Sequence, residues 1–198
     1  MPSSQTRPVA LAYWLIIASA IGWTAAFALT VEKFHAYENP GAGAACDFSV
    51  LVQCTENLNS PQGSAFGFPN PLIGLTGWMA PMVVAVAILA GARFAKWFWA
   101  LFTAGMTFAF GFVCWLIFQS IFVLSTLCPW CMVTWVVTIP SFYAVLIHAV
   151  RIGAIPLGSR AAKAAGRLSG WVPLITVVSY AIIATIAQLR LDVLMEFL

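Results

Sequence analysis

The sequence predicts an all-α integral membrane protein with five membrane-spanning helices. Hydrophobic residues make up 62% of the 198 positions and charged residues only 8%, whereas a soluble domain averages about 45–50% apolar and about 25% charged residues. Four stretches lack Asp, Glu, Lys and Arg, and each is long enough to cross a bilayer core of roughly 30 Å. The net charge of +3 is too small for a basic patch that binds a phosphate backbone, so we expect no nucleic-acid partner.

The charge-free stretches locate the spans. They cover residues 8–31, 57–92, 97–150 and 168–189, and the third is long enough for two crossings. We expect spans at residues 9–30, 72–92, 97–124, 131–150 and 171–189, with a loop at 31–71. The first apolar run is longer than the h-region of a signal peptide and lacks a clear cleavage site, so we expect it to remain in the mature protein. Residues 1–198 would then form a single membrane domain.

Positive charge determines the expected orientation. With five spans and a cytoplasmic N-terminus, only Lys33 and Arg190 lie outside, and seven basic residues are cytoplasmic: Arg7, Arg93, Lys96, Arg151, Arg160, Lys163 and Arg167. Because cytoplasmic loops carry the excess of Lys and Arg, we expect the C-terminus and the loop at 31–71 to be extracytoplasmic, at the inner or plasma membrane. The last three basic residues would share one face of a short helix at the anionic leaflet, or belong to a solvated loop that only fixes topology.

Four of the five cysteines fall on the expected outer side. Cys46 and Cys54 lie in the loop after the first span, and Cys128 and Cys131 lie where the fourth span begins. That side is the oxidising compartment in which disulfides persist. Cys114 lies inside the third span, where we expect a small buried hydrophobic residue rather than a redox group.

Cys128-Pro129-Trp130-Cys131 has a Cys-x-x-Cys spacing, which places both sulfur atoms on one face of a first helical turn. Pro129 suits the first helical position, where no intrahelical N–H bond is lost. The free N–H groups and the positive end of the helix dipole stabilise a thiolate, so the pattern predicts redox chemistry. A zinc site uses the same spacing but needs two further Cys or His ligands nearby.

Cys46 and Cys54 are separated by about 12 Å on a straight helix, whereas a disulfide requires Cα atoms roughly 4.4–6.8 Å apart. The segment must therefore bend to close the pair. One interpretation is a mobile loop whose disulfide is made and broken during turnover, which leaves Cys54 free to exchange with Cys128. The other interpretation is a static disulfide that staples the loop.

The two cysteine pairs stand among further short motifs. Cys46-Asp47 is followed by Cys54, by Ser60 six residues later, by Phe66-Gly67 and by the run from Asn70 to Gly74, and Cys-x-x-Cys opens the fourth span. This ordered combination covers about residues 10–150 and resembles the vitamin K epoxide reductase family, specifically its bacterial branch. The other family of membrane thiol oxidases, disulfide bond formation protein B, has its Cys-x-x-Cys in the first outer loop and fits less well.

The resemblance implies a four-helix bundle around a quinone of the menaquinone or ubiquinone class, with the cysteine loop over its mouth. By position, Cys46 and Cys54 would exchange with a thiol partner. Cys128 would accept electrons from Cys54, and Cys131 would face the quinone ring.

The resemblance also implies roles for residues outside the cysteine pairs. Ser60 would support the loop, and Asn70 would hydrogen-bond a quinone oxygen, although Asn70 could instead cap the second span. We expect Phe66 and Trp135 to contact the quinone, while most aromatic residues of such a chain face lipid or form interfacial belts. Relatives that reduce vitamin K epoxide carry Thr-Tyr-Ala where this chain has Thr134-Trp135-Val136, so the tyrosine hydroxyl is absent.

We therefore predict a membrane enzyme, a thiol:quinone oxidoreductase that supports disulfide bond formation. The chain ends nine residues past the last expected span, so the expected thiol partner is a separate secreted or membrane-anchored thioredoxin-fold (DsbA-like) protein, beside quinone and membrane lipid. One alternative is a quinone-epoxide (vitamin K epoxide) reductase. An alternative of another class is a membrane carrier that binds copper or zinc through the four thiols, but the outer side lacks clusters of Met and His.

Overall fold

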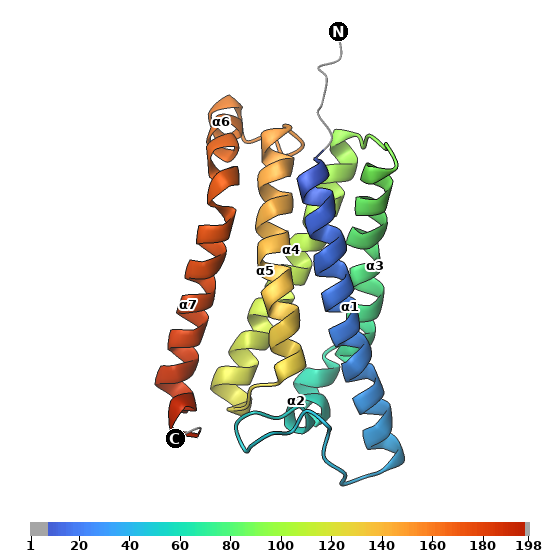
Figure 1. Cartoon of the computed structure of the whole chain (residues 1–198), viewed down its shortest axis with the longest axis vertical. Helices are drawn as coiled ribbons and strands as arrows, with labels where there is room; N and C mark the ends of the chain where they lie inside the picture. Colours follow the sequence, from blue (N-terminus) through green and yellow to red (C-terminus); the bar gives the residue numbers. More distant parts are fainter. Residues whose placement is uncertain (1–7, 197–198) are drawn as a thin grey trace.

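The computed structural model describes residues 8–196, which form a bundle of long helices (Figure 1). The longer helices are α1 (Val9–Glu38), α3 (Asn70–Leu89), α4 (Lys96–Phe118), α5 (Pro129–Arg151), α6 (Ser159–Leu168) and α7 (Val172–Leu191). The short elements are α2 (Thr55–Asn59), the 3-10 helices η1 (Pro61–Ser64), η3 (Ser169–Trp171) and η4 (Val193–Glu196), and the π-helix η2 (Gln119–Leu124). Five helical segments are long and apolar enough to span a membrane: Val9–Glu38, Asn70–Leu89, Lys96–Leu124, Pro129–Arg151 and Ser159–Leu191. The predicted fold class is confirmed.

Helix α1 is longer than the sequence predicts. The expected span ended at residue 30 because charged residues begin at Glu32, but α1 continues to Glu38. Residues 31–38 contain neither Gly nor Pro, so charge ends the apolar stretch without ending the helix. Residues 31–38, which the sequence assigned to the loop, are therefore a helical extension of α1 beyond its apolar part.

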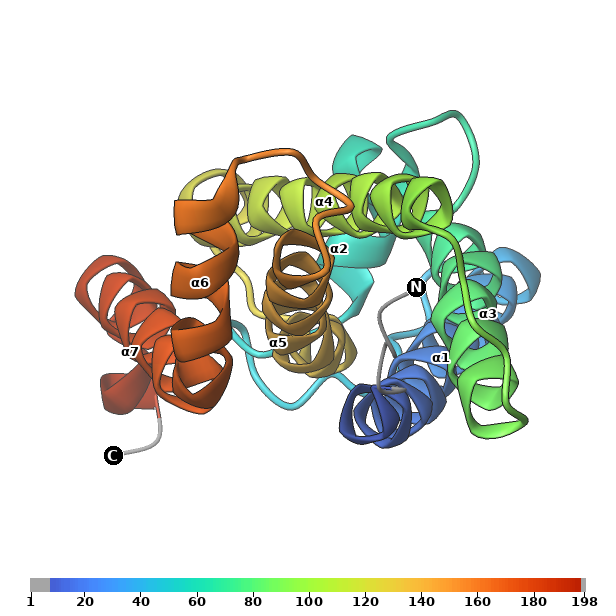
Figure 2. The same ribbon diagram turned by 90° about the horizontal axis from the view of Figure 1, so that it is seen from above.

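Packing in the bundle centres on α1 and α5. Helix α1 packs against α3 and α5, α4 packs against α5, and α7 lies outside this group along α5 (Figure 2). The contact between α1 and α3 depends on glycine: a Cβ atom at Gly22 would lie 2.1 Å from Cε2 of Trp78, and one at Gly74 would lie 2.8 Å from Cβ of Ala26. The two glycines thus let α1 and α3 approach closely.

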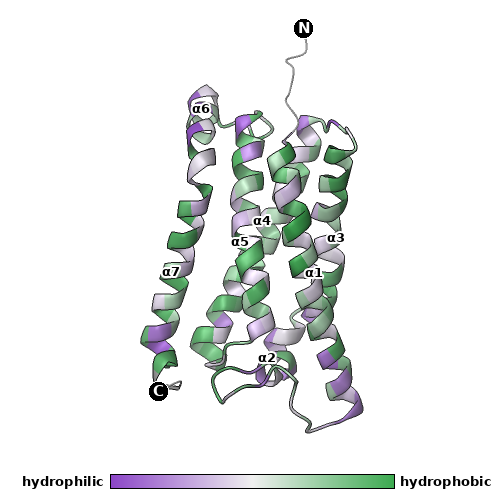
Figure 3. Cartoon of the chain, in the orientation of Figure 1, coloured by the Kyte–Doolittle hydropathy of each residue, from purple (hydrophilic) through white to green (hydrophobic). Residues whose placement is uncertain are grey.

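The chain is a multi-pass membrane protein with chemically different ends. The middle parts of the long helices are mainly hydrophobic, and hydrophilic residues gather toward the helix ends (Figure 3). The end of the bundle that carries α2 holds both cysteine pairs, and we call it the cysteine end. Arg93, Lys96, Arg151 and the three basic residues of α6 lie at the opposite end, while Arg7 falls outside the described residues.

The basic segment after the fourth span forms helix α6, in agreement with the helical interpretation. Its contact with an anionic leaflet stays a prediction. The expectation for Cys114 is wrong: its side chain is exposed on the surface of α4. Val113 and Ile117 form the buried face of that helix, and Cys114 lies one position, about 100°, away from Val113.

Candidate redox site

A single β-bridge joins the loop to the start of α5. Val52 pairs with Leu127 in parallel orientation. The Gln53 N–H donates to the Leu127 carbonyl at 3.1 Å, and the Leu127 N–H donates to the Leu51 carbonyl at 2.7 Å. Because Cys54 directly follows Gln53 and Cys128 directly follows Leu127, the bridge brings the second loop cysteine to the first cysteine of Cys-x-x-Cys.

The four predicted cysteines come together at the cysteine end. Cys46 and Cys54 form a disulfide with a Cα–Cα distance of 5.7 Å, so the segment bends as the spacing requires. The Sγ atom of Cys128 lies 3.4 Å from that of Cys54. Cys46 is 4% exposed, whereas Cys54 and Cys128 are fully buried. A thiol that reaches this disulfide from outside therefore meets Cys46 first, and Cys54 faces inward to Cys128.

The first turn of α5 stabilises a thiolate on Cys128. Pro129 occupies the first helical position, and Cys128 is the N-cap residue whose Sγ accepts the backbone N–H of Cys131 at 3.4 Å. The hydrogen bond from the Cys131 thiol is the largest effect on Cys128 and lowers its pKa. Burial and the Asp47 carboxylate act against this shift, but the backbone N–H groups of Cys131 and Trp130 add to it. The pKa of Cys128 is thus below its usual value, and the lower pKa favours the nucleophilic thiolate form.

Asp47 is the centre of the hydrogen bonds around the disulfide. One carboxylate oxygen accepts the N–H groups of Cys54 at 2.7 Å and Thr55 at 3.1 Å. The other accepts the Thr55 hydroxyl at 2.5 Å and the Ala44 N–H at 3.0 Å. Burial acts to raise the Asp47 pKa, but these hydrogen bonds together lower it below its ordinary value. The sequence interpretation used Asp47 only as part of a motif, although a carboxylate beside a cysteine and ahead of a helix was a visible signal.

A second group of polar residues joins α2 to η2 and to the turn that follows η2. The Asn57 amide donates to the Thr126 hydroxyl at 2.9 Å and accepts the Ser120 hydroxyl at 2.9 Å. Ser60 donates to the Asn57 carbonyl at 2.8 Å, and its oxygen accepts the Gly63 N–H at 3.0 Å. Ser60 therefore lies where the resemblance puts a loop-supporting residue, at the junction of α2 and η1.

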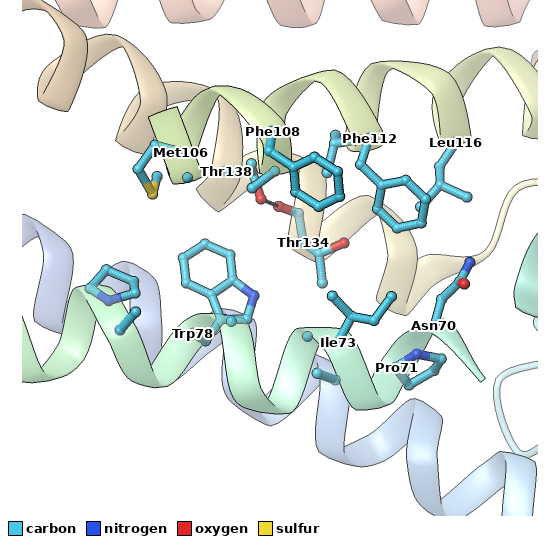
Figure 4. Close-up of a pocket in the computed structure, with 18 of the residues that line it drawn as sticks. Asn70, Pro71, Ile73, Trp78, Met106, Phe108, Phe112, Leu116, Thr134 and Thr138 are labelled. Atoms are coloured by element: carbon cyan, nitrogen blue, oxygen red, sulfur yellow. Dashed lines mark hydrogen bonds between the residues drawn. The ribbon is translucent and has the colours of Figure 1, made fainter. Parts of the chain in front are cut away.

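A large apolar cavity of about 1090 Å³ lies beneath the cysteine loop, between α3 and α4 and in front of α5. Its lining runs along α3 from Pro71 to Ala87 and includes small residues such as Gly77 and Gly105. In Figure 4, Phe108, Phe112 and Leu116 of α4 face Ile73 and Trp78 of α3 across the space, with two threonines of α5 behind. Most polar lining residues belong to the cysteine end of the cavity: Asn57, Ser60, Gln62, Asn70, Gln119, Cys131 and Thr134. Thr138 lies deeper, near Met106 in Figure 4.

The three residues expected to contact a quinone take different positions. Trp135 is 5% exposed and lines the cavity. Asn70 also lines it, but its amide already accepts the Ala65 N–H at 3.0 Å and donates to the Gln62 carbonyl at 2.7 Å, and it does not cap α3. Phe66 is 51% exposed and is not among the described residues that line the cavity. Its ring packs against Phe108 and Phe112, which do line it.

One group of ligating atoms lies close enough to hold a metal ion. The sulfur atoms of Cys46 and Cys54 and a carboxylate oxygen of Asp47 lie within 4.8 Å of one another. In the disulfide form these sulfur atoms are bonded to each other, and the Asp47 oxygens already accept four hydrogen bonds. These sulfur and oxygen atoms are therefore already used by the disulfide and by the hydrogen bonds of the loop.

Comparison with known proteins agrees with this arrangement. The model of the vitamin K epoxide reductase family matches residues 13–146, which include α3, α4, most of α1 and α5, and all five cysteines. Comparison with curated proteins found no match. The family match covers more than half of the chain, and the chain carries a cysteine pair at the end of a helical membrane bundle. It is a membrane oxidoreductase that belongs to the vitamin K epoxide reductase family.

Proposed function

We propose that the protein is a thiol:quinone oxidoreductase that oxidises a thioredoxin-fold protein outside the cytoplasm and reduces a membrane quinone. The observation that carries this proposal is the line of sulfur atoms from the loop to the cavity. Cys46 is the less buried residue of the disulfide, the Sγ atom of Cys54 lies 3.4 Å from that of Cys128, and Cys131 lines the cavity. Each neighbouring pair is placed for one thiol–disulfide exchange.

The proposed relay has three balanced steps. A dithiol partner attacks Cys46, becomes a disulfide and leaves Cys46 and Cys54 as thiols. The Cys54 thiolate then attacks Cys128 in a Cys128–Cys131 disulfide, Cys131 leaves as a thiolate, and Cys46 reforms the loop disulfide by releasing Cys128. Finally two electrons and two protons pass from Cys128 and Cys131 to the quinone, which becomes a hydroquinone, and the Cys128–Cys131 disulfide forms.

The described arrangement corresponds to the state before the last step. The loop pair is a disulfide, and Cys128 and Cys131 are free thiols. In this state Cys131 is the cysteine at the cavity, and Cys128 carries the lowered pKa. Cys128 is therefore suited to be the thiolate that closes the disulfide with Cys131 as the electrons leave.

The cavity fits a quinone better than a polar substrate. Its walls are apolar along most of their length, and the polar side chains gather beside Cys131. Thr134 and Thr138 each donate their hydroxyl proton to a carbonyl of α5 at 2.7 Å, so their oxygens remain available to accept a hydrogen bond from a hydroquinone hydroxyl. Asn70 and Trp135 are further candidates to contact the quinone ring. Phe66 would not touch the quinone directly but would support Phe108 and Phe112, which line the cavity.

One specific feature supports quinone over quinone epoxide as the substrate. Trp135 stands in the cavity wall where epoxide-reducing relatives carry tyrosine, so no phenolic hydroxyl is available at that position. The large cavity extends along α3 and can hold the long apolar tail that both substrates would carry. We also propose that the cysteine end lies outside the cytoplasm, because six described basic residues lie at the other end. The whole chain would form one membrane domain.

Turnover of purified protein in lipid nanodiscs tests the proposal. Dithiothreitol as electron donor and a short-tailed ubiquinone or menaquinone as acceptor should give multiple turnovers, followed by the absorbance change of the quinone. A matched protein with Cys128→Ser should stop after the loop disulfide is consumed. Continued turnover in that variant would contradict the relay, and turnover with vitamin K epoxide but not with quinone would favour the alternative reaction.

A further inference from the structure

The extension of α1 holds both arms of the cysteine loop. Glu32 accepts the backbone N–H of Ala45 at 3.1 Å, next to Cys46. The adjacent Lys33 donates to the carbonyl of Leu58 at 2.7 Å and to the side-chain oxygen of Asn59 at 3.1 Å, at the far end of α2 from Cys54. Two consecutive residues of one helix therefore hold the chain before the first loop cysteine and after the second.

Lys33 is unusual because its ammonium group is buried. The side chain is 8% exposed, both hydrogen-bond acceptors are neutral, and the Nζ atom lies 4.9 Å from the centre of the Tyr37 ring. Removing a lysine from water is costly unless specific hydrogen bonds replace its hydration. A carbonyl at the end of a helix and an aromatic ring are suitable partners for a cation.

The contact with Leu58 acts directly on the helix that begins at Cys54. The Leu58 N–H donates to the Cys54 carbonyl at 2.9 Å, so Leu58 and Cys54 are the two ends of one helical turn. Asp47 accepts the free N–H groups of Cys54 and Thr55 at the start of that turn. An anion at the beginning of α2 and a cation at its end therefore hold Cys54 beside Cys128.

We propose that Lys33 is a positioning residue that keeps Cys54 within reach of Cys128 when the loop disulfide is open. While Cys46 and Cys54 are bonded, the disulfide itself restricts the loop. Once a thiol has opened it, Cys54 is held by the pairing of Gln53 with Leu127 on one side and by α2 on the other, and Lys33 supplies the contact at the end of that helix. This inference rests on the proposed exchange between Cys54 and Cys128.

The role of Lys33 can be measured as a competition between the Cys46–Cys54 and Cys54–Cys128 disulfides. In a Cys131→Ala background, a glutathione redox buffer allows Cys54 to bond with either Cys46 or Cys128, and acid quenching, alkylation and peptide mass spectrometry give the ratio of the two bonds. Lys33→Met should lower the share of Cys54–Cys128 relative to Cys46–Cys54 by about tenfold, which corresponds to about 1.4 kcal/mol. Lys33→Arg should restore most of the ratio, and Lys163→Met, on the exposed face of α6, should leave it unchanged.

A purely structural role is distinguished by further measurements. If Lys33→Met does not fold, Asn59→Ala removes only one acceptor and should lower the ratio by a smaller factor. An unchanged ratio in Lys33→Met, or no recovery in Lys33→Arg, would overturn the inference. The assay contains no quinone and no protein partner, so a failure of wild-type quinone reduction would refute the proposed function without changing the result for Lys33.

Discussion

Leu127 forms a parallel bridge with Val52, and this one pairing joins two segments that are far apart in the sequence and close to different redox cysteines. Its two hydrogen bonds involve Leu51, Gln53 and Leu127. Cys54 and Cys128 follow the bridge directly, and their sulfur atoms lie 3.4 Å apart. The backbone pairing therefore sets the distance between the sulfur atoms of Cys54 and Cys128.

Cys131→Ala should abolish quinone reduction and let a Cys54–Cys128 disulfide form in exchange with Cys46–Cys54, because Cys131 can no longer release Cys128 and only Cys46 remains to resolve that bond. A faster-migrating band on a non-reducing gel, absent after Cys54→Ala, would identify it. Cys114→Ala should leave turnover within about twofold of the parent, because the Cys114 side chain is exposed on α4 and contacts no redox cysteine. Loss of quinone reduction in Cys114→Ala with retention in Cys131→Ala would place the acceptor on the exposed face of α4 at Cys114 and not in the cavity.

Alkylation of Cys128 should follow a pKa below the ordinary cysteine value of about 8.5. The hydrogen bond from the Cys131 thiol lowers the pKa, so the thiolate fraction at neutral pH exceeds that of a free cysteine. The rate of iodoacetamide modification, measured between pH 5 and 10 by peptide mass spectrometry with the loop disulfide intact, gives the value. Cys131→Ala should move the midpoint upward, and an unchanged midpoint would show that the Cys131 thiol has no such effect.

Asp47→Asn should loosen the loop, because an amide accepts fewer of the four hydrogen bonds and leaves donors unpaired. The expected cost is about 1–3 kcal/mol of local stability, visible as faster hydrogen exchange at Cys54 and Thr55. Since the Asp47 pKa is lowered in the folded protein, its contribution is complete above the unfolded value of about 3.9 and is lost as the pH falls through the lower folded value. Asp192→Asn, at the end of α7, is the control and should leave loop exchange unchanged.

Gly105→Leu should raise the quinone KM by filling part of the cavity. A Cβ atom at Gly105 meets no other atom within 4 Å, and the residue lines the cavity. Gly111 on the same helix is equally open and does not line the cavity, so Gly111→Leu controls for the gain in helix propensity. Equal KM values in the two variants would mean that the quinone does not use this cavity. Disulfide exchange between the loop and Cys128 should be the same in both.

An impermeant maleimide added to intact cells after reduction should label the loop cysteines. We propose from the charge distribution that the cysteine end lies outside the cytoplasm, and Cys46 is the less buried member of its pair, 4% exposed against 0% for Cys54. Cys46→Ser should remove most of the label. Labelling that requires disruption of the membrane would reverse the proposed orientation.

The five spans and the first turn of α5 could be predicted from the sequence because both depend on local patterns. Charge-free stretches locate membrane helices, and the position of Pro129 at the start of the helix, inside Cys-x-x-Cys, is a property of one turn. The predicted end of α1 was wrong, because the apolar stretch stops before Glu32 whereas the helix continues to Glu38. The prediction that Cys114 is buried was also wrong, because a small residue in an apolar helix can face lipid as readily as the bundle interior.

Contacts between distant segments could not be read from the sequence. Gly22 and Trp78 fit together only because α1 and α3 run side by side, and no local pattern pairs them. Lys33 entered the sequence argument only as a positive charge on the side where such charges are rare. Its contact with Leu58 depends on where the loop folds back, and the two hydrogen bonds of the Asn70 amide depend on the same path.

The apolar cavity beside α3 determines which substrate concentration controls turnover. A substrate that enters and leaves through such a space stays dissolved in the bilayer, so its concentration is a mole fraction of lipid and not an aqueous molarity. The proposed quinone would diffuse in two dimensions, whereas a soluble thiol donor such as dithiothreitol diffuses in three. Diluting the nanodiscs or vesicles in buffer should therefore slow the reaction with the thiol donor and leave the encounter with quinone unchanged.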